Sequence, residues 1–368
     1  MENNKLSLVL PVVLNNEPEP IAFLSAKRRI EALADKYNVP VEVGAFLAFM
    51  PGFARNPANF EKQIENQKKY KLPIRLVETG VQENNSLAYT PEDPTFNPEM
   101  PSQLESVVRH VAILRDIDST APERLVVAPH VGVQTVAKYY HGVESIKQGD
   151  FGRPGVYSPE DFQELENKIY DRVEENFGRL KEVGGRKGLE LALENTPPIE
   201  VKNNHLNLPG LHYHLLPFNE REKLIKLSNG KIVLDVSHLA ISNFTPEQIN
   251  GNKSIEGQEA LFRIMRLDNW DAYRNAMGKP ESYFPYAKAL HMSQASGIGF
   301  ELPSGPECDI WGGKGTGNGL LSNQDFHKFF DFARANNLPV CIEEVYDTKN
   351  LTFREADAFL EPIFAGYS

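Results

Sequence analysis

The feature that most constrains the fold of this chain is a series of short apolar runs separated by longer amphipathic or polar segments. Each run is rich in Val, Ile and Leu, which is typical of strands buried on both faces. The runs span residues 6–14, 39–47, 72–80, 124–132, 189–196, 231–239, 288–294 and 338–346. Eight strands that alternate with helices predict an α/β fold of the (β/α)8 TIM barrel type, with a doubly wound open sheet as the lesser alternative.

Three of the intervening segments carry clear helix signals. Residues 22–38, 158–185 and 322–337 are amphipathic, and the last two begin with Ser-Pro-Glu-Asp and Ser-Asn-Gln-Asp, which are typical helix caps. A chain of 368 residues is long enough for two domains or for one large barrel. No linker-like, low-complexity or repeated segment interrupts the pattern, so the sequence predicts a single TIM-barrel domain over residues 1–368.

The segments that follow the fifth, sixth and seventh strands are longer than the others. They are rich in aromatic residues, Pro or Gly, and they leave the carboxyl ends of strands, where barrels build their sites. We expect long loops that form the sides or the lid of a pocket. The segment GGKGTGNG after the seventh strand lacks the spacing of a phosphate-binding loop, so we expect a mobile loop that closes over the barrel mouth.

Charge and cysteine content narrow the class of partner. The formal net charge is −11 and the pI is about 5.4, which opposes binding to duplex nucleic acid or to an anionic membrane. The two cysteines, Cys308 and Cys341, are too few for a disulfide framework. The apolar run at the amino terminus is too short for a membrane span and lacks the features of a signal peptide. We expect a cytoplasmic protein with a small-molecule substrate; its oligomeric state, a homo-oligomer included, stays open.

Five of the predicted strands end in side chains of the types that can bind a metal ion. These side chains are His130, Glu194, Asp235 together with His238, His291 and Glu343. Side-chain alternation places Glu343 on the same face as Cys341, His291 with Ala289, and Glu194 with Ala192, and we expect these faces to point into the barrel. Acids and imidazoles that converge at one rim require a cation among them, and this donor set suits Mn²⁺, Co²⁺, Zn²⁺ or Fe²⁺.

The order of these motifs resembles the xylose-isomerase-like TIM-barrel superfamily. "LENT", "LDVSH", "LHMS", a Gly-rich segment and a strand ending in Glu follow one another as Glu, Asp-x-x-His, His and Glu do in that family. The family includes sugar-phosphate isomerases and epimerases, abasic-site nucleases of the endonuclease IV type (AP endonuclease family 2) and multinuclear non-haem iron oxidases. The resemblance implies that Glu194, Asp235, His291 and Glu343 are metal ligands. It also implies that His238 is a second-site ligand or a substrate contact, and that His130 in "APHVG" is a further ligand.

One departure from the family pattern separates the candidate functions. Where the nuclease branch carries Asp-x-His after the seventh strand, this chain has Asp309 followed by Trp311, so the three-metal nuclease set is incomplete. The leading hypothesis is therefore a metal-dependent isomerase or epimerase of a small sugar or polyhydroxy carbonyl compound. In it Glu194 and Glu343 transfer protons while His238 and His130 hold hydroxyl groups.

Three alternatives remain. A multinuclear iron oxidase would use the additional histidines, a phosphodiesterase would use the nuclease-like motifs, and a binding barrel would catalyse nothing. The histidines that favour the oxidase are His130, His205, His212, His214 and His238. For "HYH" at 212–214 a solvated loop is the slightly favoured interpretation.

A few other residues carry weaker expectations. Glu42 and Glu78 are expected at the ends of the second and third strands, as candidate substrate contacts. His110 and His327 lie on helical segments and are expected to be packing or surface residues. Tyr283 is one of several loop aromatics for which a pocket role and simple packing are equally supported.

Overall fold

A computed structural model gives the structure of the protein. It describes residues 5–49, 56–79, 87, 100–129, 133–137, 159–195, 199–202, 210–214, 221–241, 275, 278–292, 321–342, 346–347, 352–353 and 356–367. Every structural statement below concerns these residues.

The central sheet contains a strand in each of the eight apolar runs. All of its neighbouring strands pair in parallel. The strands are β1 (Leu6–Val12), β2 (Val41–Ala48), β3 (Ile74–Glu78), β4 (Leu125–Ala128), β6 (Leu189–Leu191) with β7 (Leu193–Glu194), β10 (Ile232–Asp235), β11 (Ala287–Met292) and β12 (Pro339–Ile342). The expected number, order and direction of the strands are thereby confirmed.

The sheet closes on itself at the fifth apolar run. β6 pairs with β4, and β7 pairs with β10. Between them, the N–H of Ala192 donates to the Val127 carbonyl at 3.0 Å, and the N–H of Leu193 donates to the Lys231 carbonyl at 3.0 Å. One extended segment thus changes partner from β4 to β10 and joins the two edges. The fold is therefore a (β/α)8 barrel, and the alternative of an open doubly wound sheet is wrong.

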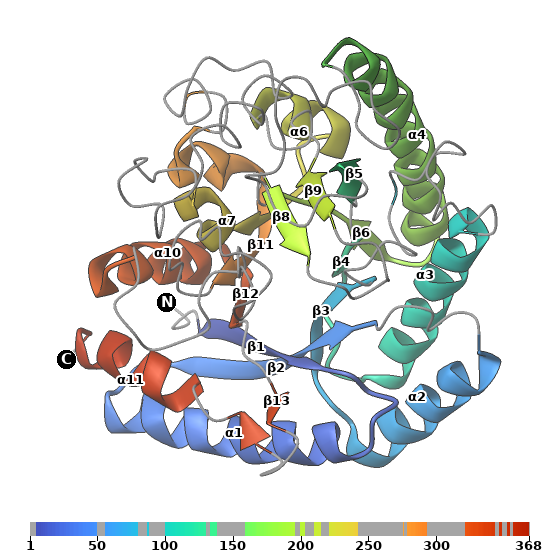
Figure 1. Ribbon diagram of the computed structural model, residues 1–368. Helices are drawn as coiled ribbons and strands as arrows, with labels where there is room; N and C mark the ends of the chain where they lie inside the picture. The colour runs from blue at the N-terminus through green and yellow to red at the C-terminus, as the bar shows by residue number, and fades with distance from the viewer. Residues whose placement is uncertain are drawn as a thin grey trace.

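Helices surround the barrel, as Figure 1 shows. They are α1 (Pro18–Lys36), α2 (Pro57–Tyr70), α3 (Met100–Ile117), α4 (Pro159–Gly185), α6 (Arg221–Ser228), α7 (Val236–Ile241), α10 (Asn323–Asn336) and α11 (Ala356–Ala365), with the 3-10 helix η5 (Pro280–Tyr286) before β11. The three predicted helices correspond to α1, α4 and α10. At the start of α10, Ser322 and Asp325 form the expected capping box.

The barrel separates two apolar cores. The smaller core fills the barrel interior, and the larger one packs between the strands and the helices. The interior core consists of Val9, Phe46, Leu76, Val126, Ala128, Ala192, Val233, Ala289 and Cys341. Val340 and Ile342 belong to the outer core, whereas Cys341 between them belongs to the inner one. The predicted alternation along β12 is therefore confirmed.

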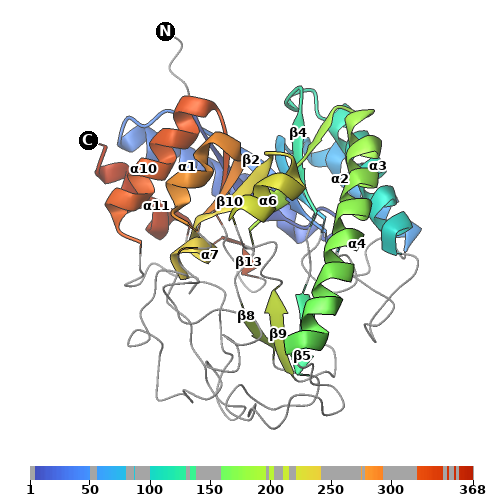
Figure 2. The same ribbon diagram turned by 90° about the horizontal axis from the view of Figure 1, so that it is seen from above.

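A small antiparallel sheet lies beyond the carboxyl ends of the barrel strands (Figure 2). It pairs β5 (Val133–Ala137) with β9 (Gly210–His214), and β9 with β8 (Ile199–Lys202). β13 (Tyr346–Asp347) and β14 (Thr352–Phe353) form a short hairpin after β12. The sequence "HYH" therefore lies in a strand, so the expectation of a solvated loop is wrong. Its backbone pairs with β5 on one side and with β8 on the other.

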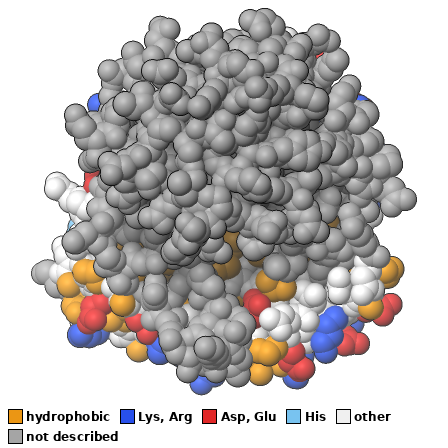
Figure 3. Space-filling view, in the orientation of Figure 1, with side chains coloured by type: hydrophobic (Ala, Val, Ile, Leu, Met, Phe, Trp, Pro, Cys, Tyr) orange, Lys and Arg blue, Asp and Glu red, His pale blue; other side chains and the backbone are white. Residues whose placement is uncertain are grey.

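The described surface visible in Figure 3 carries acidic and basic side chains side by side along the rim formed by α1, α2 and α11. Two exposed ion pairs belong to this region, Lys36 with Glu361 and Lys69 with Glu17. Among the described helices, none combines the length and the apolar character that crossing a membrane requires.

Candidate metal centre

Three neighbouring strands deliver acidic and imidazole side chains to one end of the barrel interior. Glu194 is the last residue of β7, Asp235 is the last residue of β10, and His291 is the penultimate residue of β11. Two positions before each of them stands a member of the interior core. These three members are Ala192, Val233 and Ala289. Because alternate residues of a strand share a face, all three polar side chains point into the barrel at its carboxyl end, as predicted.

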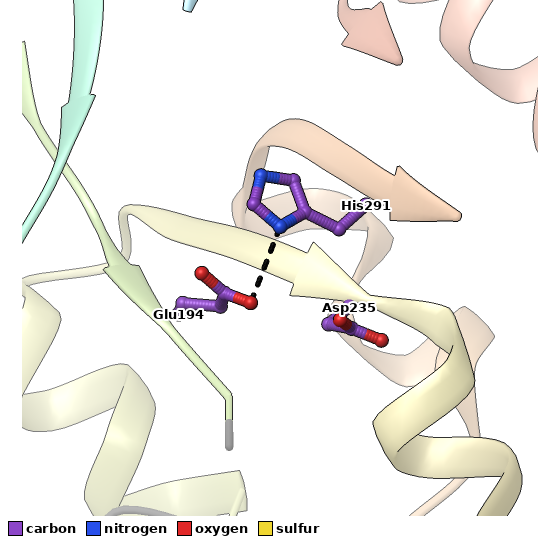
Figure 4. A group of neighbouring side chains, drawn as sticks. All are labelled: Glu194, Asp235 and His291. Atoms are coloured by element: carbon purple, nitrogen blue, oxygen red, sulfur yellow. Dashed lines mark ion pairs between the residues drawn. The ribbon is translucent and has the colours of Figure 1, made fainter. Parts of the chain in front are cut away.

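The three side chains converge closely (Figure 4). One potential ligand atom from each of Glu194, Asp235 and His291 lies within 4.8 Å of the other two. Nδ1 of His291 is 3.2 Å from Oε1 of Glu194. The exposed fraction is 3% for Glu194 and 0% for Asp235 and His291. Within the described residues, this group is the one that brings metal-ligating side chains together in this way.

The donor set fits a divalent cation. Two buried carboxylates at this separation repel each other, and the low dielectric of the interior strengthens that repulsion. Transition-metal ligands stand about 2.0–2.2 Å from the ion, so two donors of one ion are at most about 4.4 Å apart. The observed spread of up to 4.8 Å requires only a small closure. Two carboxylates and one imidazole suit Mn²⁺, Co²⁺, Zn²⁺ or Fe²⁺.

Two further side chains hold the cluster in place. The ring of Phe46, on β2, meets the His291 ring edge to face, with centroids 5.3 Å apart and planes at 72°. This contact restricts the rotation of the imidazole. The carboxamide of Asn195 binds the backbone of Asp235 through two hydrogen bonds. Sequence reasoning missed Asn195, although a polar residue directly after the inward Glu194 was an available signal.

Several predicted site residues lie outside the described part of the chain. They are Glu343, His130, His205 and Asp309, and the Gly-rich segment expected to close over the barrel mouth lies outside it too. His238 lies in α7, three residues beyond Asp235, but its side chain is not among those described. The same holds for the side chains of His212 and His214. The roles assigned to these residues stay predictions.

The two weaker carboxylate candidates behave differently. Glu78 ends β3 and is 5% exposed, two residues after Leu76 of the interior core. Its partners in the neighbouring strands are the small residues Ala48 and Ala128, so Glu78 lies inside the same end of the barrel as the cluster. Glu42, in contrast, is the second residue of β2, which continues to Ala48. The expectation that Glu42 ends its strand is wrong, and it lies at the amino-terminal end, paired with Arg75.

The two histidines expected on helices, His110 and His327, and Tyr283 serve packing. His110 is 5% exposed, its Nε2 lies 2.9 Å from Oε1 of Gln63, and burial lowers its pKa to about 4. Nε2 of His327 lies 2.6 Å from the carbonyl of Ile363, which links α10 to α11. Tyr283 is fully buried in the outer core, where burial raises its pKa. Packing is thus the observed role of all three.

No protein-family model and no curated protein matches the chain. Solved structures do. The TTHB071 protein of Thermus thermophilus, soaked with zinc chloride, matches with a TM-score of 0.47 and 14% identity, covering 98% of this chain and 99% of the other. The 3-keto-D-glucoside 4-epimerase YcjR of E. coli matches with a TM-score of 0.46 and 14% identity, covering 99% of each chain.

A third match is the D-psicose 3-epimerase of Clostridium cellulolyticum, solved with D-tagatose. Its TM-score is 0.45 and its identity 12%, with 98% of each chain covered. Matches with such low identities and TM-scores carry no argument for this chain. Its barrel topology follows from its own strand order, and its candidate site is defined by its own side chains.

Proposed function

We propose that this protein is a metal-dependent isomerase or epimerase that acts on a small sugar or polyhydroxy carbonyl compound. The observation that carries the proposal is the buried group of Glu194, Asp235 and His291 at the carboxyl end of the barrel. Parallel barrels place their catalytic residues at this end. A cation-binding group there suits a substrate that offers adjacent oxygen atoms.

The side chains of the barrel strands supply the ligands for the cation. Glu194, Asp235 and His291 hold the cation, and Glu343 joins them at the end of the eighth strand, as the sequence predicts. A bound divalent cation supplies Lewis acidity, which polarises a substrate carbonyl and acidifies the neighbouring C–H bond. The Phe46 ring keeps the His291 imidazole in the plane in which it faces Glu194.

In this proposal, two carboxylates on different sides of the substrate transfer the protons. β7 and β12 are separated in the barrel by β10 and β11. Because Glu343 directly follows β12 in the sequence, we expect it to approach the centre from another direction than Glu194. One carboxylate removes the proton from the carbon beside the carbonyl, and the other returns a proton to that carbon or its neighbour. His238 and His130 hold substrate hydroxyl groups, and Glu78 is a further contact on the opposite wall.

The proposal is tested by hydrogen exchange into a sugar. The protein, loaded in turn with Mn²⁺, Co²⁺, Zn²⁺ or Fe²⁺, is incubated with a panel of ketohexoses and 3-keto sugars in D₂O, and the products are followed by proton NMR. We expect deuterium at the carbon next to the carbonyl and a new epimer or isomer. Glu343→Gln should abolish both without unfolding the protein.

Glu42→Gln is the matched control, because it makes the same change at the other end of the barrel and should leave the exchange intact. Protein that binds the cation but exchanges no substrate hydrogen contradicts the proposal. Several irons per chain with consumption of O₂ would establish the oxidase instead. Cleavage of an abasic-site duplex would establish the phosphodiesterase.

A further inference from the structure

We infer that Asn195 is a positioning residue, which fixes Asp235 relative to Glu194 and so sets the separation of two cation ligands. The inference rests on the proposed cation site. It concerns a side chain that is itself not a ligand. Asn195 is fully buried and directly follows Glu194 in the chain.

The need for such a residue follows from where two strands end. The last paired residues of β7 and β10 are Glu194 and Val233, so Asp235 lies beyond the ladder that the two strands share. In an extended strand, the N–H and the C=O of one residue point to the same side. Because β11 already flanks β10 on one side, the backbone of Asp235 needs hydrogen-bonding groups on the side where β7 has ended.

The carboxamide of Asn195 occupies that position. The N–H of Asp235 donates to Oδ1 of Asn195 at 2.8 Å, and Nδ2 of Asn195 donates to the Asp235 carbonyl at 2.9 Å. A carboxamide offers one acceptor and a donor in one plane, as a peptide group does. The side chain therefore extends by one peptide the ladder that β7 and β10 share up to Glu194 and Val233.

This arrangement couples the two carboxylates mechanically. Asp235 is bound to the residue next to Glu194, so a shift of either strand end moves both ligands together. Partners that orient metal ligands typically contribute 10- to 100-fold to metal affinity. Neither Ala nor Ser can reproduce the paired donor and acceptor at this reach.

A second buried asparagine provides the matched control. Asn66, on α2, is 1% exposed, and its Nδ2 donates to the Leu14 carbonyl at 2.7 Å. It makes the same kind of side-chain bond to the backbone, but it lies outside the ligand cluster. Asn66→Ala should therefore cost stability and leave cation binding unchanged.

The experiment measures Mn²⁺ and Co²⁺ binding by calorimetry in the full-length wild type, Asn195→Ala, Asn195→Ser and Asn66→Ala, together with thermal unfolding of each metal-free protein. We expect about 10- to 100-fold weaker binding in both Asn195 variants and an altered Co²⁺ absorption spectrum. Asn66→Ala should lower the melting temperature and keep the wild-type affinity and spectrum. If Asn195→Ala fails to fold, Asn195→Ser, which retains a hydroxyl, gives the measurement.

Wild-type affinity in a folded Asn195 variant would overturn the inference and leave the proposed function standing. A loss of affinity in Asn66→Ala as large as that in Asn195→Ala would overturn it too, because stability alone would then explain both. Absence of binding in the wild type would overturn the proposed function itself, and the inference with it.

Discussion

The two ends of the barrel place similar charged groups in opposite surroundings. At the amino-terminal end, Arg75 contacts Glu42 at 2.5 Å and Lys231 contacts Glu190 at 3.0 Å, and all four side chains are partly exposed. Arg75, Glu42 and Glu190 line a cavity of about 410 Å³. At the carboxyl end, Glu194 and His291 are 3.2 Å apart and buried. Water screens the first set of charges and is excluded from the second.

The ends also differ in the sign of their charge. At two register shifts in the sheet, a positively charged side chain is left without a paired residue and lines the amino-terminal cavity. The partners of β2 pass from Ile74 to Leu76 and skip Arg75, and the partners of β10 skip Lys288 in the same way. The cavity is lined by the cations Lys5, Arg75, Arg124 and Lys288 and by the acids Glu42 and Glu190. A metal ion is thus repelled from one end and attracted to the other.

Removal of one buried carboxylate should have the largest effect. Asp235→Asn keeps the shape of the side chain and removes a negative charge from the donor set. We expect the affinity for Mn²⁺ or Co²⁺ to fall by more than about 100-fold, which exceeds the usual effect of an outer partner, and sugar turnover to be lost. Calorimetry and the NMR exchange assay measure the two effects.

The same variant should not destabilise the metal-free protein, because it relieves repulsion between two buried carboxylates. If Asp235→Asn keeps the wild-type cation affinity, or loses it only because the protein unfolds, the carboxyl end would not be distinguished from the amino-terminal end as the cation site.

Cation binding should stabilise the fold through the carboxyl end alone. A cation at 100 times its Kd, bound only by the folded state, adds about 2.7 kcal/mol to the free energy of unfolding. Thermal unfolding with Mn²⁺ and with a chelator measures the difference. We expect the gain in the wild type and in Glu42→Gln, and not in Asp235→Asn. A gain that survives in Asp235→Asn would place the cation elsewhere.

The barrel and the inward ligands were predictable because both follow from local patterns. Strands buried on both faces must be apolar throughout, which made the eight runs visible in the sequence. The period of two then fixed which residues share a face, and it correctly placed Glu194 with Ala192 and His291 with Ala289. Neither step depends on contacts between distant segments.

What the sequence did not reveal depends on such contacts. β5 follows β4, whereas β8 and β9 both follow β7, and these short strands of mixed polar and apolar residues pair with one another. The role of Asn195 depends on β7 ending two residues earlier than β10 at their interface. Glu42 was misplaced because its strand extends to Ala48, six residues beyond it.

A buried imidazole that contacts a neutral carboxamide shows the effect of burial on a pKa. His110 packs between Phe60 and Phe49 and faces the neutral Gln63, and burial lowers its pKa to about 4. An unfolded histidine has a pKa of about 6.5, so between these values the unfolded state binds the extra proton. The contribution is fully present above about pH 6.5 and is lost as the pH falls toward 4.

From this shift we expect the free energy of unfolding to drop by about 2 kcal/mol more in the wild type than in His110→Gln between pH 7 and pH 5. Urea unfolding at the two pH values measures it. Equal losses in the two proteins would show that His110 does not carry this part of the acid sensitivity.

The smallest effect is expected at the amino-terminal end. Glu42→Gln removes a charge from a carboxylate whose side chain is 40% exposed, and Arg75 keeps Asp118 at 3.7 Å as a second partner. Exposed ion pairs contribute up to about 1 kcal/mol, and salt screens them. We therefore expect a loss below about 1 kcal/mol in urea unfolding, smaller still at high salt, with cation affinity unchanged. A larger loss of unfolding free energy, or weaker cation binding, would mean that charges at the two ends of the barrel interact through its interior. The difference in burial would then not make the two ends independent.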